Sequence, residues 1–180
     1  MQVLEKLLSI YSPKYEEEIV YKSRMLHFID NYENVFSRKQ THGHFTASSF
    51  LLNSDCTKFL LMHHKKLNRW LQPGGHCDDE TNILSVSIKE TSEESGIYDI
   101  TPVSLNIFDI DIHKIPKNLR DPEHFHYDIR FLLKANNDRF IKNEESNELR
   151  WVELRNFDND EYKLEKSITR MIEKYKKNHY

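Results

Sequence analysis

Three glutamates in one short segment are the residues of this sequence best placed to do chemistry. Glu90, Glu93 and Glu94 stand at positions i, i+3 and i+4, so on a helix their carboxylates point the same way. Three negative charges on one surface repel one another unless water or cations lie between them. Because oxygen-only ligands suit Mg²⁺ or Mn²⁺, the spacing predicts a divalent-cation site.

The flanking residues carry the signals of a helix that follows a tight turn. Thr81 or Asn82 can cap the start of this helix, and Gly96 can end it in a left-handed turn. The predicted packing stripe of the helix is Leu84, Ile88 and Thr91. Ahead of the helix, Gly74 and Gly75 follow a proline, and such a backbone turn lets a phosphate or a metal approach closely. Both glycines are therefore predicted to bind substrate.

This stretch resembles the Nudix box, Gly-x5-Glu-x7-Arg-Glu-U-x-Glu-Glu-x-Gly-U, in which U is a bulky aliphatic residue. The positions that match are Gly75, Glu90, Glu93, Glu94, Gly96 and Ile97. The positions that depart are Thr81 for the first Glu, Lys89 for the Arg and Thr91 for an aliphatic residue. A solvated acidic helix would explain the carboxylates alone, but not the glycines at matching spacing. All of the family's main metal-ligand positions are kept.

The resemblance implies both a fold and a reaction. It implies an α/β (α+β) fold, a Nudix-type α/β/α sandwich with a mixed β-sheet. It also implies hydrolysis of the diphosphate linkage of a nucleoside diphosphate joined to another group, with Mg²⁺ or Mn²⁺ on the box glutamates. Lys89 and Arg130 are further candidates for substrate contacts. The general base is a box glutamate or, as in several family members, a glutamate on a later loop, where Glu145 and Glu148 stand.

Ten histidines are a high number for one small acidic chain, and several of them cluster. Their order is similar to that of one Nudix branch, isopentenyl diphosphate isomerase, which binds a metal through histidines and glutamates outside the helix. The matching positions here are His44, His76, His124 and His126, with His42 close to the first. This resemblance implies a second metal site, and neutral imidazoles suit Zn²⁺, Mn²⁺ or Fe²⁺ better than Mg²⁺.

Two other functions remain open from the sequence. Isomerase activity is the less favoured one, because that enzyme needs a cysteine just before the glycine-histidine pair, where this chain has Gly74. The other is a Nudix-fold nucleotide-binding or regulatory module that is catalytically weak, with Thr81 and Lys89 as the damaging changes. Retention of every main carboxylate favours the enzyme.

Substrate choice is only weakly indicated. The aromatic residues that could stack on a base are Phe45, Trp70, Phe125 and Tyr127. A basic run, residues 63–66 with Arg69, could meet phosphates. The net charge of −3 gives no general attraction to nucleic acid or anionic membrane, so we expect a small nucleotide-type diphosphate as the partner.

The chain is long enough for one domain with a core. Two cysteines give no disulfide framework, no apolar run reaches the length of a membrane span, and the acidic amino terminus does not resemble a secretory signal, so a cytoplasmic location is expected. Helical spacing predicts helices over 2–11 and from Pro13 to about Asp30. We expect an N-terminal helical extension at 1–40, which covers the sheet or pairs two subunits as a homodimer, and a Nudix domain at 41–180.

Within the second region, the pattern alternates between strands and helices. Strand-rich runs begin at His44, at Lys58 after a Ser54-Asp55 turn, at Val103 and at His124, with a shorter run around Trp151. A closing helix is predicted from about Asp160 to Lys177. Its inward residues are predicted to be Leu164, Ile168, Met171, Ile172 and Tyr175.

Overall fold

The computed structural model describes residues 2–117, 122–144 and 146–179. Its helices are α1 (Gln2–Ile10), α2 (Glu16–Asn31), α3 (Ile83–Ser95), α4 (Asn159–Tyr162) and α5 (Lys166–His179). Its strands are β1 (Gly43–Leu52), β2 (Lys58–His64), β3 (Arg69–Leu71), β4 (Gly74–His76), β5 (Ile100–Pro102), β6 (Asp109–Ile115), β7 (His124–Ala135) and β8 (Ser146–Glu153). None of the described helices is both long and apolar enough to cross a membrane.

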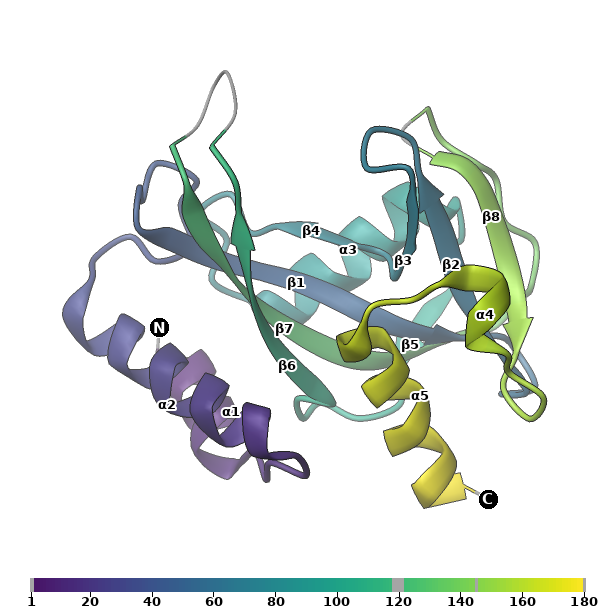
Figure 1. Ribbon diagram of the computed structural model, residues 1–180, viewed down its shortest axis with the longest axis horizontal. Helices are drawn as coiled ribbons and strands as arrows, with labels where there is room; N and C mark the ends of the chain where they lie inside the picture. The colour runs from purple at the N-terminus through teal and green to yellow at the C-terminus, as the bar shows by residue number, and fades with distance from the viewer. Residues whose placement is uncertain (1, 118–121, 145, 180) are drawn as a thin grey trace.

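The strands form one mixed sheet with a central parallel pair (Figure 1). Strands β1 and β7 run parallel over ten residue pairs, and the other pairings are antiparallel. The order is β3-β2-β1-β7-β5, while β4 pairs with β1, β6 with β7 and β8 with β2. The mixed sheet between helices confirms the fold predicted from the box.

Side-chain alternation along β1 builds a separate core on each face of the sheet. Phe45 and Ala47 belong to a core shared with α1, α2 and α3. Phe50 and Leu52 belong to a second core, which α5 completes. In Figure 1, α3 accordingly lies behind the sheet and α5 in front of it. Two layers of helix thus hold the sheet, and the polar positions on the α5 face, beginning with His44, are left for a site.

The two N-terminal helices, α1 and α2, share the first core with the sheet. Leu4, Leu8 and Met25 are buried there, and the ring of Phe28 stacks on Tyr127 of β7 with centroids 4.3 Å apart. Both helices lie within one to three residues of their predicted limits, the largest difference being the start of α2 at Glu16 instead of Pro13. Whether residues 1–40 form a separate extension stays a prediction.

Two element boundaries differ from those expected. The closing helix is interrupted at Lys163, whose left-handed backbone (φ 51°) ends α4 before α5 begins. The run from Val103 is not a strand at its start, because Val103 and Leu105 are exposed and β6 begins only at Asp109. The predicted inward residues of the closing helix are all buried.

Candidate active site

Both ends of helix α3 carry capping residues that were predicted from the sequence. Ser85 N donates to Asn82 Oδ1 over 3.3 Å, so Asn82 is the N-cap, and Gly96 ends the helix with φ 69°. The predicted packing stripe is partly corrected, since Leu84 and Ile88 are only half-buried against the core. The fully buried face is built from Ile83, Val86, Ser87, Thr91, Ser92, Glu94 and Ser95.

The threonine that replaces an aliphatic box residue lies in a polar seam. Thr91 Oγ1 lies 2.6 Å from the Ser87 carbonyl oxygen and 2.7 Å from Ser49 Oγ of β1. Ser87 Oγ in turn donates to the Ser48 carbonyl oxygen over 2.8 Å. Hydrogen bonds therefore attach α3 to β1 where the family pattern uses apolar packing.

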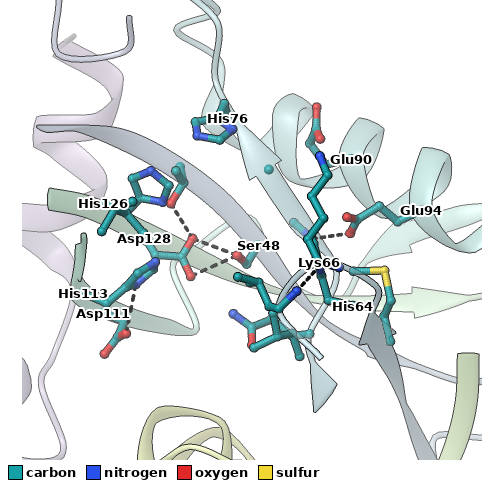
Figure 2. A pocket seen from close by; sticks show the side chains of 18 of the residues that line it. Ser48, His64, Lys66, His76, Glu90, Glu94, Asp111, His113, His126 and Asp128 are labelled. Carbon is teal, nitrogen blue, oxygen red and sulfur yellow. Dashed lines mark hydrogen bonds and ion pairs between the residues drawn. The ribbon is translucent and has the colours of Figure 1, made fainter. Parts of the chain in front are cut away.

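The glycine turn of β4 and the box glutamates fit together closely. Glu94 is buried, and its Oε2 accepts a hydrogen bond from Gly74 N over 2.8 Å. A Cβ on Gly75 would lie 2.0 Å from Glu90 Oε2, so only glycine leaves room for that carboxylate. Glu93 is the most exposed of the three glutamates. Figure 2 shows Glu90 and Glu94 on the same side of the pocket.

The support lost with the box Glu and Arg is replaced from elsewhere in the chain. Lys89 Nζ lies 3.1 Å from Glu90 Oε1 and 3.7 Å from Glu93 Oε2, one turn along α3. Arg38 supplies a two-pronged guanidinium contact to Asp78 in the loop before the helix. A forked arginine therefore still fixes this loop, although it comes from outside the box.

These glutamates line one wall of a cavity of about 980 Å³. Its other walls come from β1, β6, β7, the β2–β3 hairpin and the start of α5. The cations among the described lining residues are Arg38, Lys66, Arg69, Lys114, Lys117 and Arg130. The cavity is large enough for a nucleotide-sized ligand and places carboxylates and cations around the same space.

The floor of the cavity is a buried carboxylate, Asp128. Its Oδ1 accepts hydrogen bonds from Thr46 Oγ1 (2.9 Å) and Ser48 Oγ (2.8 Å), and its Oδ2 accepts from Arg130 Nε (2.7 Å). Asp128 is not among the residues predicted for the site, although alternation along β7 places it on one strand face with His124 and His126. The alternation along β7 was the signal that could have identified it.

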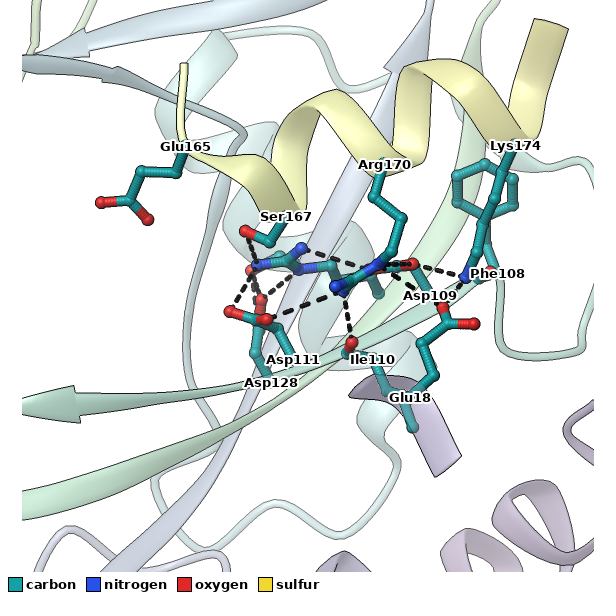
Figure 3. Close-up of polar contacts among 12 residues, drawn as sticks. Glu18, Phe108, Asp109, Ile110, Asp111, Asp128, Glu165, Ser167, Arg170 and Lys174 are labelled. Atoms are coloured by element: carbon teal, nitrogen blue, oxygen red, sulfur yellow. Dashed lines mark hydrogen bonds and ion pairs between the residues drawn. The ribbon is translucent and has the colours of Figure 1, made fainter. Parts of the chain in front are cut away.

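Arg130 is held in a buried charge network rather than presented to a ligand. Its guanidinium lies 3.2 Å from Asp109, 3.3 Å from Asp111 and 2.7 Å from Asp128. The other members of this charge network are Glu18, Arg170 and Lys174 (Figure 3). Burial alone would raise the pKa of Asp111, but Arg130, His113 and Arg170 together outweigh that effect and the pKa lies at about 2. The predicted phosphate contact of Arg130 is therefore replaced by a role in the cavity floor.

Four predicted histidines meet in a second cluster beside the cavity. We call His44, His76, His124 and His126 the histidine centre. The ring centroids of His44 lie 5.1 Å, 5.0 Å and 4.8 Å from those of His76, His124 and His126. Among the described residues, His44, His124 and His126 form the one group of three metal-ligating side chains whose ligand atoms lie within 4.8 Å of one another. His42 lies outside the centre, with its ring against Tyr32.

Burial keeps the imidazoles of His76 and His126 neutral. Loss of hydration, followed by the charges of nearby basic groups, lowers the pKa of His76 to about 4 and that of His126 to about 2. His124 Nδ1 lies 2.8 Å from the Pro122 carbonyl oxygen, so Nδ1 donates and Nε2 faces His126 Nε2 at 3.3 Å. The histidine centre therefore presents neutral nitrogen donors from at least His76 and His126.

The later loop is only partly as predicted. Glu145 lies outside the described residues. Glu148 lies on β8, 2.6 Å from Arg150, and is absent from the described cavity lining. Two neighbours on the same loop, Asn143 and Glu144, line the cavity instead. Among the described residues, the loop glutamate that lines the cavity is Glu144, while Glu145 stays a prediction.

The aromatic residues expected to stack on a base lie elsewhere. Phe45 and Tyr127 are buried on the opposite face of the sheet, under Phe28. Trp70 packs between Arg150, whose Cζ lies 5.2 Å from a Trp70 ring centroid, and Tyr162, whose ring centroid lies 5.6 Å away. Phe125 shares the face of Tyr127 and lies under the guanidinium of Arg24. None of these four aromatics is among the described residues that line the cavity.

Comparison with known proteins agrees with this geometry. The structure is similar to a NUDIX-family hydrolase from Clostridium perfringens (22% identity, TM-score 0.59, 78% of this chain and 99% of that chain). It is also similar to the Ap4A hydrolase of C. elegans (20%, 0.56, 74% and 95%) and to the dihydroneopterin triphosphate pyrophosphohydrolase of E. coli (13%, 0.54, 74% and 95%). No curated protein matches the sequence. A family model for the NUDIX domain matches residues 42–175, well over half of the sequence, and the chain therefore belongs to the Nudix hydrolase family.

Proposed function

We propose that this protein hydrolyses the diphosphate linkage of a nucleoside diphosphate joined to another group, with Mg²⁺ or Mn²⁺ at Glu90, Glu93 and Glu94. One observation carries the proposal: all three carboxylates line the same cavity wall, and Gly75 leaves the space that Glu90 occupies. Hard oxygen donors on successive helical turns fit these cations. When bound there, such a cation lowers the pKa of a water and offsets charge on phosphoryl oxygens.

The residues of the chain then position the reaction. Gly74 N holds the Glu94 carboxylate in place. Glu144, on the loop that borders the cavity, is our candidate to accept the proton of the attacking water, with Glu145 beside it in the sequence. Lys66 and Arg69 line the side formed by the β2–β3 hairpin and are placed to bind phosphate oxygens.

The histidine centre supports a second proposal, a separate transition-metal site. Its nitrogens are neutral, close together and partly oriented, as metal ligation requires. Such donors suit Zn²⁺, Mn²⁺ or Fe²⁺. Metal analysis of protein purified without a histidine tag tests this site. We expect one equivalent of transition metal that His126→Ala removes, and protein that never retains such a metal would contradict the proposal.

Substrate screening tests the hydrolase proposal. Phosphate release would be measured with Mg²⁺ or Mn²⁺ over ADP-ribose, nucleotide sugars, dinucleoside polyphosphates, coenzyme A and nucleoside triphosphates. We expect metal-dependent product from at least one class, and none after chelation. Nucleotide binding without any product would favour the binding module instead. Turnover of isopentenyl diphosphate to its isomer would favour the isomerase.

The predicted homodimer keeps some support from the N-terminal helices. Four apolar side chains on α1 and α2 are more than half exposed: Val3, Ile10, Ile19 and Val20. Sedimentation analysis of the full chain, compared with Ile19→Lys, tests whether this surface pairs two copies. A cytoplasmic location stays a prediction of the sequence.

A further inference from the structure

The described lining of the cavity lacks a phenylalanine, tyrosine or tryptophan platform on which a nucleobase could stack. Among the described residues that line it there is no phenylalanine, tyrosine or tryptophan. Its apolar lining is aliphatic and consists of Met62, Leu67, Leu71, Ile115 and Pro116. Where proteins bind bases through aromatic rings, each stacked base contributes roughly 5- to 150-fold in affinity. This cavity has no ring of that kind to supply the contribution.

The other planar groups of the lining are already engaged. The rings of His76 and His126 meet edge to face within the histidine centre, with centroids 4.9 Å apart. The Nδ1 atom of His64 accepts from Lys66 N over 3.2 Å, which holds its ring in the β2–β3 hairpin. Arg38 is ion-paired with Asp78 and Arg69 with Glu165. These contacts fix where the imidazole and guanidinium groups lie in the lining.

The sheet itself keeps the aromatic residues away from the cavity. Along β1 and β7, alternate side chains point to opposite faces, so Phe45 and Tyr127 lie under α2 while Ser48 and Asp128 face the cavity. Moving the rings across would require a one-residue shift of register, which would also carry Asp128 out of the cavity floor. The lack of aromatic lining follows from the fold and not from one rotamer.

The cavity instead offers groups that bind phosphates and hydroxyls. Cationic side chains reach it from the β2–β3 hairpin (Lys66 and Arg69), from the end of β6 (Lys114) and from the segment after β6 (Lys117). The polar lining also includes amide, hydroxyl and carboxylate groups: Gln72, Asn143, Glu144, Glu165 and Ser167. Mixed cations, amides and carboxylates can donate to phosphate oxygens and accept from sugar hydroxyls.

We propose that this cavity recognises the phosphorylated, hydroxylated part of its diphosphate substrate and leaves a nucleobase outside. A sugar diphosphate without any base is then as good a substrate as the matching nucleotide. This inference rests on the proposed hydrolase function, because it assigns the substrate class of the same site. It goes beyond that function because it requires that the protein does not discriminate between substrates with and without a base.

Ribose 5-diphosphate and ADP form the matched pair that tests the inference, because they differ only in adenine. Initial rates with Mn²⁺ should give kcat/KM values within about threefold of each other. The same threefold window should hold in Trp70→Ala, the variant that removes the partly exposed indole. A preference of tenfold or more for ADP would overturn the inference, and its loss in Trp70→Ala would place the base on Trp70.

A binding experiment separates this inference from the hydrolase proposal. Competition calorimetry with AMP and ribose 5-phosphate, in the presence of Mg²⁺, needs no turnover. We expect dissociation constants within about threefold of each other, even if no diphosphate is hydrolysed and the hydrolase proposal fails. Tenfold tighter binding of AMP, or no binding of ribose 5-phosphate, would overturn the inference while leaving hydrolysis to be judged by product release.

A gain-of-function variant sharpens the same test. Leu71 lines the cavity from β3 and is partly exposed, so Leu71→Trp would add the stacking surface that the wild type lacks. ADP should then become at least fivefold better than ribose 5-diphosphate, whereas the matched control Leu71→Met should leave the ratio unchanged. An unchanged ratio in Leu71→Trp would count against the inference.

Discussion

Two polar regions lie on the same face of the sheet, and they satisfy their charges in opposite ways. In the charge network, carboxylates and cations alternate: Arg130 contacts three aspartates, and Lys174 contacts Glu18 and Asp109. In the histidine centre, imidazoles contact other imidazoles. In the charge network, negative side chains lie against positive ones, whereas the histidine centre brings together side chains of one kind.

The difference shows which region is built for the fold and which for a ligand. Buried ions are tolerated when each has an oppositely charged partner, so the charge network can fix α5 and α2 against β6 without any outside group. Like groups gathered in one place are stabilised by something that binds between them. Substitutions in the two regions should therefore change different quantities.

The largest effect is expected from the charge network. Arg130→Met leaves three buried aspartates without their shared cation and should lower the free energy of unfolding by about 3–5 kcal/mol. Urea denaturation of metal-free protein measures the change. The matched substitution in the histidine centre, His126→Leu, should cost less than about 1 kcal/mol in the same assay. Equal losses in both variants would break the comparison.

Acid should destabilise the two regions in separate pH ranges. The folded pKa of His76 is about 4 against an ordinary 6.5, so the unfolded chain takes up this proton first as the pH falls. Stability from this group is complete above pH 6.5 and decreases by about 3 kcal/mol down to pH 4. Asp111, with its pKa lowered from 3.8 to about 2, contributes a further loss only below about pH 4.

A histidine variant separates these two pH ranges. Unfolding of metal-free protein, followed from pH 7 to pH 3, should lose about half of its slope between pH 6.5 and pH 4 in His76→Asn, because His126 still contributes there, while the loss below pH 4 remains. A wild-type profile that is flat between pH 6.5 and pH 4 would contradict the buried, neutral state of the histidine centre.

Zn²⁺ should stabilise the protein by binding to the histidine centre and not to the box glutamates. At a free concentration a hundred times the dissociation constant, we expect about 2.7 kcal/mol of added stability. Thermal unfolding should show this gain in the wild type and in Glu94→Gln, but not in His126→Ala. Loss of the gain in both variants would mean that the two clusters form one site.

The smallest predicted effect concerns the start of the box helix. Asn82→Ala removes the side chain that accepts from Ser85 N and should lower the free energy of unfolding by about 1 kcal/mol. Thr81→Ala, one residue earlier, is the control and should change it by less than about 0.5 kcal/mol. A larger loss from Thr81→Ala would show that the cap is misassigned.

Local signals in the sequence were enough to predict the helices and the box. The spacing of apolar residues located α1 and α2, Asn82 and Gly96 marked the ends of α3, and the alternation in β7 placed His124 and His126 on one face. Each of these features depends on neighbours within a few residues, which a single sequence contains.

Features set by tertiary contacts could not be predicted in this way. Alternation separates Tyr127 from Asp128, but only the packing of α2 shows that the tyrosine face is covered. Arg130 looked like a phosphate ligand because its partners Asp109 and Asp111 lie on another strand. Glu148 was predicted to reach the cavity and Glu144 was not considered, because the path of the loop decides which glutamate lines the cavity.

The measurement that tests the central claim most directly is the Mn²⁺-dependent kcat/KM of Glu94→Gln on the best substrate of the screen. Glu153→Gln, a similar change at an exposed glutamate on β8 that pairs with Lys58, is the matched control. We predict a loss of at least about 100-fold for Glu94→Gln, because a ligand of the reacting cation is removed, and less than about threefold for the control. Full activity in Glu94→Gln would contradict the assignment of the box glutamates as the catalytic centre.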